Sequence, residues 1–155
     1  MPTESKMGSA ACSPAETTPA RQPVRAREAM IAGMTPALDP RLYVFCTAPA
    51  VPPDLAARAL ATFAEDEGIT LVLGADVPTA AAITRSDPMA RITLTVHSAL
   101  DGVGLTAAVA GALADAEIPC NVIAAFHHDH IFVPSGDAAE ALGVLQALQA
   151  GAQAG

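Results

Sequence analysis

The chain has 155 residues and a formal net charge of −8, and 52% of its residues are apolar. This length allows one domain or two small ones, and the small number of Lys and Arg residues argues against nucleic-acid partners. No uninterrupted apolar run is long enough to cross a bilayer. The three dispersed cysteines include no C-x-x-C pair, which is typical of a reducing compartment. We therefore expect a cytoplasmic protein without a membrane partner.

Residues 1–27 are rich in Pro, Ser, Thr, Ala and Glu. Such a segment buries too little apolar surface to offset the entropy lost on ordering, so we expect a disordered tail. Two structured units should follow, at residues 28–88 and 89–150. Residues 151–155 should form a flexible C-terminus.

The first unit is predicted to have β-α-β order. Residues 42–47 are rich in β-branched and aromatic side chains and favour a strand. Prolines at 49, 52 and 53 delay a helix until Asp54, which can cap it. Apolar residues at helical spacing then predict a helix that ends at Gly68. Residues 69–73 form the second predicted strand.

The second unit has stronger local patterns. Residues 92–97 alternate between apolar and polar, as in a half-buried strand. A glycine-bearing turn follows, and from Leu105 the apolar period becomes helical until Pro119. Two β-rich runs, 122–126 and 131–133, then predict a hairpin, and residues 137–149 a last helix. The combined order predicts an α+β fold of two packed ferredoxin-like units, with antiparallel sheets and helices on one face.

Each ferredoxin-like unit needs a fourth strand, and the second unit ends about where that strand should begin. We therefore predict that residues 29–34 and further strands are exchanged between the halves. Residues 122–126 are apolar on both faces, which is typical of a central strand in a sheet covered on both sides. The second face would then meet the other half or a second copy, so we expect a homodimer.

Several strings of the sequence resemble a small bacterial family of tandem ACT-domain proteins. Its second half is matched by Thr95–Ser98, Val103–Val109, Cys120–Val122 and His127–His130, and its first half by Phe45–Thr47 and Ala64–Gly68. The likeness extends over about residues 29–148. It implies two units of the βαββαβ type. It also implies a regulatory module that binds a small molecule, commonly an amino acid, and needs neither catalysis nor a cofactor.

The turn that enters the helix at Leu105 is the predicted ligand site. A helix N-terminus offers unpaired N–H donors for a carboxylate, and Asp101 can receive an ammonium group. Spacing alone favours an ordinary connection capped by Asp101. The resemblance instead implies an effector site, because ACT modules bind effectors at this turn and the neighbouring strand edge. The predicted ligand-binding residues are His97, Ser98, Leu100, Asp101, Val103, Gly104, Leu105, Asn121 and Val122.

Two alternative functions remain open at this point. The run His127–His130 contains three imidazoles and a carboxylate, which can ligate a divalent metal. No complementary ligand pair occurs elsewhere, so we interpret the run as a polar hairpin tip and predict no metal. The other alternative is an assembly module without a ligand. Cys46 and Cys120 lie in apolar segments and have no activating partner, so we predict that the protein is not an enzyme.

Overall fold

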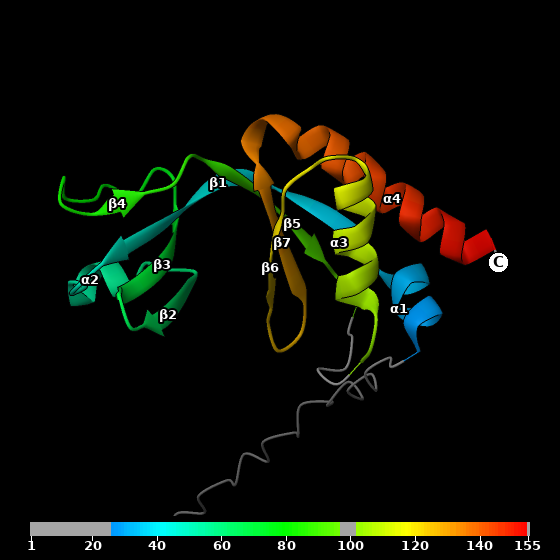
Figure 1. Cartoon of the computed structure of the whole chain (residues 1–155), viewed down its shortest axis with the longest axis horizontal. Coiled ribbons are helices and arrows are strands. Elements are labelled where there is room, and N and C mark those ends of the chain that lie inside the picture. Colours follow the sequence, from blue (N-terminus) through cyan, green and yellow to red (C-terminus); the bar gives the residue numbers. More distant parts are fainter. Residues whose placement is uncertain (1–25, 97–101, 155) are drawn as a thin grey trace, which may run out of the picture.

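A computed structural model describes residues 26–96 and 102–154 of the chain (Figure 1). The helices are α1 (Arg27–Gly33), α2 (Pro53–Ala56), α3 (Leu105–Asp115) and α4 (Ala138–Ala154), with a 3-10 turn, η1 (Ser135–Asp137), before α4. The strands are β1 (Pro36–Ala48), β2 (Ala61–Glu65), β3 (Gly68–Gly74), β4 (Thr84–Arg85), β5 (Met89–Leu94), β6 (Asn121–Ala124) and β7 (Asp129–Pro134).

One long strand, β1, joins the two halves of the sheet. The strand order is β2–β3–β1–β5–β7–β6, with short β4 also on β1, and every pair is antiparallel. Residues 36–38 of β1 pair with β5, and residues 43–48 pair with β3. The register shifts between Leu38 and Leu42, because Pro40 has no N–H to donate to a ladder.

Each half of the sheet has the strand order of a ferredoxin-like unit. The first unit is β2–β3–β1–β4, and the second is β6–β7–β5–β1. The fourth strand of the second unit is therefore the beginning of β1, which precedes the rest of that unit in the chain. This arrangement confirms the predicted fold class and an exchange of strands between the halves. The exchanged strand is residues 36–38 of β1, however, and the prediction that residues 29–34 are exchanged as a strand is wrong, because they belong to α1 and its end.

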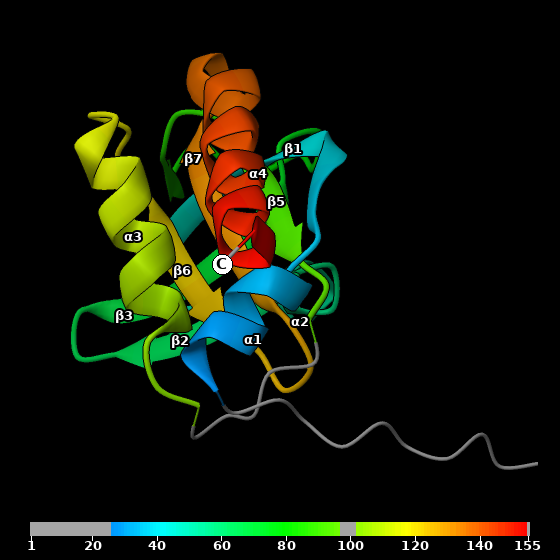
Figure 2. The ribbon, with the colours of Figure 1, turned by 90° about the vertical axis from the view of Figure 1, so that its right-hand side faces the viewer.

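Helices α1, α3 and α4 cover one face of the second unit (Figure 2). Met30 and Met34 of α1 are fully buried in its core, together with residues of β5, β7, α3 and α4. The side-chain amide of Gln153 donates to the carbonyl oxygen of Ala32 at 2.8 Å. Residues 151–154, which we expected to be flexible, thus continue α4 and hold α1 in place.

The long helix predicted to end at Gly68 is wrong. Only Pro53–Ala56 makes a helical turn, and residues 61–65 form β2. The apolar spacing of the segment suits a helix, yet Thr62 and Phe63 favour a strand, and β3 offers them a partner. Gly68 is the first residue of β3, directly after the hairpin turn. Its φ is 150°, and a Cβ there would lie 2.8 Å from the Ala48 oxygen.

The predicted central position of residues 122–126 is also wrong, because β6 is an edge strand. Its two middle residues are nevertheless half-buried on opposite faces, whereas Asn121 and Ala124 are exposed. Val122 packs on the helix-side core, and Ile123 packs on a small aromatic cluster on the opposite face. That cluster forms where Tyr43 and Phe45 of β1 meet Phe132 edge to face, at centroid distances of 5.9 and 5.3 Å. Aromatic residues of the first unit therefore cover part of the face that the helices leave open.

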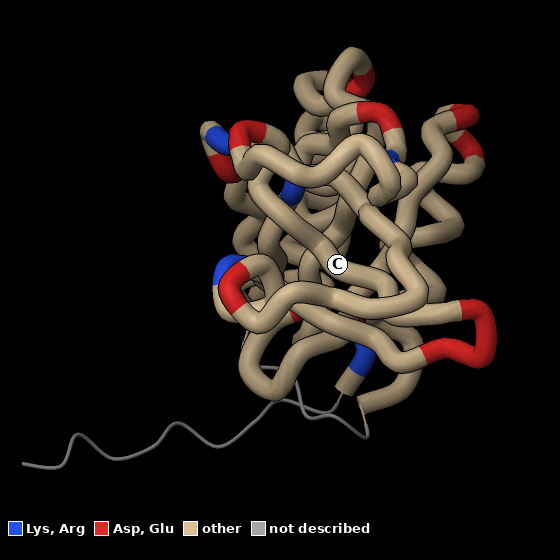
Figure 3. Tube along the Cα trace, turned by 90° about the vertical axis from the view of Figure 1, so that its left-hand side faces the viewer, with Lys and Arg blue, Asp and Glu red and all other residues tan. Residues whose placement is uncertain are grey.

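Charged residues lie mainly on turns and strand ends. The turn between β2 and β3 carries three successive acidic residues, 65–67, and projects from the body of the molecule (Figure 3). Within the described ranges, no helix is long and apolar enough to cross a membrane.

Candidate functional site

The start of α3 is shaped by Gly104. This residue is the N-cap, with φ of 104° and ψ of −10°, a conformation that L side chains rarely adopt. Gly104 has no side chain to cap the helix, and the first backbone bond runs from the Ala108 nitrogen to the Gly104 oxygen at 3.0 Å. The first-turn N–H groups therefore have no side-chain acceptor at the N-cap, and the positive end of the helix dipole favours an anion there.

Arg27 of α1 lies against Gly104. A Cβ on Gly104 would be only 2.8 Å from the Cδ of Arg27, so the glycine makes room for this side chain. Arg27 forms no ion pair with a carboxylate of the described residues. A cation beside the positive end of a helix dipole is electrostatically unfavourable. A bound anion would be attracted to both the Arg27 guanidinium and the helix N-terminus.

Asp129 provides a negative group at the same end of the second unit. It is the first residue of β7 and is only 8% exposed. It pairs with Leu94, the last residue of β5, and strand alternation places it on the helix-covered face with Ile131. None of the described residues donates a hydrogen bond to its carboxylate. Burial raises the pKa of Asp129, an effect that His128 partly offsets.

Only part of the predicted ligand site can be located. His97, Ser98, Leu100 and Asp101 lie outside the described residues. Val103 is 82% exposed just before the helix, Gly104 is its N-cap, and Leu105 is buried in the core. In the described part of the turn, the residue before the N-cap is therefore exposed to solvent, and the first residue of the helix packs in the core.

The structure does not bring Asn121 and Val122 to the start of α3. The chain traverses α3 before β6 begins, so these two residues lie at the far end of the unit (Figure 1). Asn121 pairs with Phe132, and its Nδ2 lies 4.0 Å from the sulfur of Met89. Val122 faces the helix-side core. The prediction that Asn121 reaches the same pocket is wrong.

Two residues of this site were not predicted from the sequence. One is Arg27, and the other is Asp129, which lies on the face of the sheet opposite to His130. Arg27 lies next to the polar tail, and no local pattern links it to α3. The alternation of Asp129 with Ile131 and Val133 did carry a signal, because it places the carboxylate on the apolar face of a strand.

The described histidines do not assemble a metal site with Asp129. His130 lies on the opposite face of the sheet, with its Nδ1 3.1 Å from the Thr93 hydroxyl, and His128 Nδ1 is 3.4 Å from the Val96 oxygen. Burial, with the nearby charge of Arg91, lowers the pKa of His130. Across residues 26–96 and 102–154, no group of three or more His, Cys, Asp or Glu is arranged to hold a metal ion.

Gly104→Ala should lower the free energy of unfolding by about 1–3 kcal/mol, because alanine is strained at this φ and its methyl would displace Arg27. Gly111→Ala is the matched control within α3. No described atom lies within 4 Å of a Cβ at Gly111, so alanine there should stabilise by about 0.5–1 kcal/mol. Urea denaturation of both variants checks the pair, and equal effects would contradict the special role of Gly104.

Comparisons with known proteins give a consistent result. Two models described as ACT domain match the chain, one over residues 24–90 and the other over residues 90–147. A Vibrio cholerae protein of unknown function, described as a possible transport protein, is 44% identical with a TM-score of 0.69, over 79% of this chain and 94% of that one. None of the curated proteins compared with the chain matches it.

Two more distant structures share the fold. The regulatory subunit of aspartate kinase from Thermus thermophilus is 11% identical with a TM-score of 0.55, over 75% of this chain and 97% of that one. Aspartokinase III of E. coli is 14% identical with a TM-score of 0.56, over 73% of this chain and 32% of that one.

Proposed function

Because the chain belongs to the ACT-domain family, as a regulatory ligand-binding module with two ACT domains in tandem, we propose that its ligand is an amino acid. The ligand binds where α3 begins. Its carboxylate accepts hydrogen bonds from the first-turn N–H groups of α3 and pairs with Arg27. Its ammonium group pairs with the buried carboxylate of Asp129.

The buried side chain of Asp129, whose carboxylate accepts no hydrogen bond from the described residues, is the observation that carries this proposal. A buried charge without a partner is costly, and proteins generally pair it or neutralise it. An ammonium group would compensate it, and the positive end of α3 with Arg27 would compensate a carboxylate. The two halves of a zwitterion therefore match the two ends of the site. The side chain of the amino acid would extend toward Val103, which is exposed.

We further propose that the protein acts without catalysis. Burial raises the pKa values of Cys46 and Cys120, which is the opposite of what an activated thiolate requires. The effect of the ligand would instead be a shift between two arrangements of the units, or of two copies. The available energy is the difference in ligand affinity between those arrangements. A homodimer in the cytoplasm is the expected working form, and a separate partner receives the signal.

A thermal-shift screen of the twenty amino acids on the full-length chain tests this proposal. A ligand that binds only the folded state stabilises it, by about 2.7 kcal/mol at one hundred times its Kd. We expect one amino acid or a related group to raise the melting temperature. Its N-acetyl and methyl-ester derivatives are the matched controls, because each removes one of the two charges and should lose the shift. If none of the twenty raises the melting temperature, the amino-acid assignment is wrong.

A further inference from the structure

The arginines of the described residues are unevenly distributed. Three of the five, Arg41, Arg58 and Arg91, gather near the middle of β1, although the whole chain has a net charge of −8. This cluster belongs mainly to the first unit, away from the start of α3 (Figure 1). Such a concentration of guanidinium groups in an acidic protein calls for a specific explanation.

A cavity of about 290 Å³ lies between two of these arginines. Arg41 and Arg58 line it together with Asp76, and Tyr43, Leu60 and Val77 supply apolar walls. A second hollow of about 250 Å³ shares Arg41 and Asp76. The cavity lies where β3 ends and the chain enters β2. Its size, at the low end of the range for ligand pockets, suits a small molecule.

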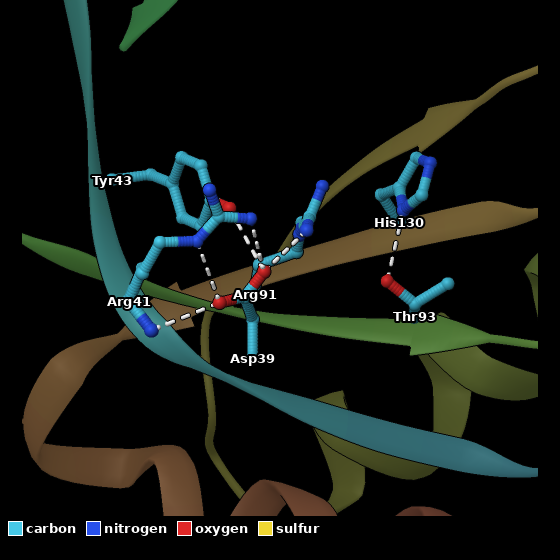
Figure 4. A network of polar contacts seen from close by, with 6 residues as sticks. All are labelled: Asp39, Arg41, Tyr43, Arg91, Thr93 and His130. Atoms are coloured by element: carbon cyan, nitrogen blue, oxygen red, sulfur yellow. Dashed lines mark hydrogen bonds and ion pairs between the residues drawn. The ribbon is translucent and has the colours of Figure 1, made fainter. Parts of the chain in front are cut away.

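Arg41 is held in place by a network that reaches the second unit (Figure 4). Its Nε and Nη2 donate to the two carboxylate oxygens of Asp39 at 3.2 and 3.1 Å. The Tyr43 hydroxyl donates to the same carboxylate at 2.9 Å, and Arg91 of β5 pairs with it as well. The Arg91 guanidinium lies 4.8 Å from the centre of the Tyr43 ring. One carboxylate therefore fixes two guanidinium groups.

The network leaves positive charge uncompensated. Asp39 is nearly buried, at 9% side-chain exposure, and Arg91 is 13% exposed with its Nε buried and without a partner. The neighbouring guanidinium groups, Arg41 first, hold the pKa of Asp39 well below its usual range, although burial opposes them. Arg58 has no hydrogen bond or ion pair to any described residue. Arg41 and Arg91 thus share the single carboxylate of Asp39, and the cavity beside them is lined by Arg41, Arg58 and Asp76.

We propose that this cavity binds a small organic oxyanion with two negative charges, either a phosphate group or a dicarboxylate. The planar guanidinium fork of Arg58 can bind either group in a bidentate manner. Arg41, whose Nε and Nη2 already donate to Asp39, adds positive charge and its remaining Nη1. Arg58 is free to move onto the ligand, whereas Asp39 presents Arg41 in a fixed orientation. Because Arg41 shares Asp39 with Arg91, the bound anion acts on a contact between the two units. This site is separate from the amino-acid site at α3.

Titration of the full-length chain with inorganic phosphate, succinate and acetate, followed by NMR at constant ionic strength and pH 7.5, tests the site. We expect saturable binding of phosphate or succinate at least tenfold tighter than that of acetate, with shifts of the amide signals of residues 41, 58–60 and 74–77. Binding of phosphate alone identifies a phosphate ligand, and binding of succinate alone a dicarboxylate. Absence of saturable binding by both overturns the proposal.

Variants distinguish specific binding in the cavity from a non-specific effect of the net charge. Arg58→Ala should weaken the binding at least tenfold, whereas Gln146→Glu on the exposed face of α4, which changes the net charge equally, should leave it unchanged. Asp76→Asn should tighten the binding of an anion. Equal affinities of Arg58→Ala and Gln146→Glu, or weaker binding by Asp76→Asn, would overturn the assignment. Asp129→Asn should bind the anion as the unmodified chain does, so this result is independent of the amino-acid site.

Discussion

Met30→Ala should lower the free energy of unfolding of the whole chain by about 2–5 kcal/mol, the usual cost of emptying a fully buried methionine site. Met30 lies in α1, far from the second unit in sequence, yet its side chain fills that unit's core. Typical domains are stable by only about 5–15 kcal/mol, so this loss is a large fraction of the total. Urea denaturation followed by circular dichroism measures it.

Glu28→Ala is the matched control for this experiment, because Glu28 is exposed on the same helix. Its loss should cost about 1 kcal/mol or less, through the helix dipole alone. If the two variants are equally stable, α1 does not belong to the core. A fragment of residues 89–155 lacks both α1 and the beginning of β1. If it folds with full secondary structure, the second unit does not need these segments to complete it.

Asp129→Asn should have two opposite effects, a higher melting temperature without ligand and the loss of stabilisation by the amino acid that protects the unmodified chain. Burial raises the pKa of Asp129 in the folded state, so ionisation of the carboxylate opposes folding. The penalty is absent below the ordinary pKa of 3.8, grows as the pH rises through the raised folded value, and is constant above it. Asparagine has nearly the same shape and no such penalty.

Thermal melts between pH 4 and pH 8, with and without the amino acid, measure both effects. The advantage of Asp129→Asn over the unmodified chain should increase with pH over the lower part of this range. Asp66→Asn, in the exposed turn between β2 and β3, is the control and should behave like the unmodified chain. A destabilised Asp129→Asn variant that still responds to the amino acid would show that this carboxylate is structural.

Local periodicity was a sound guide where one face of an element meets the core. Helix α3 follows its apolar stripe, with Leu105, Val109 and Leu113 all buried. The hairpin of β6 and β7 follows its two β-rich runs. In these segments propensity and tertiary packing agree, so the pattern along the chain is enough to predict the element.

Periodicity failed where the tertiary partner decided between two compatible structures. Residues 55–63 have helical spacing, but β3 binds residues 61–65 as a strand, and Leu60 donates its N–H to the Val72 oxygen at 2.7 Å. The edge position of β6 could not be predicted from its residue pattern, for a similar reason. Ile123, on its second face, packs on a cluster that includes aromatic residues of the first unit, which no pattern within β6 reveals.

The amino-acid sequence by itself determined the class of the fold, the α3 and hairpin elements of the second unit, and the likeness to tandem ACT proteins, because each depends on neighbours a few residues apart. Only the tertiary structure decided that β1 completes both units, that Arg27 meets Gly104, and that Asn121 lies far from that helix start. These facts depend on contacts between segments distant in the chain. Such contacts form because exposed strand edges and apolar faces need partners, and the sequence pattern does not specify which partner each one finds.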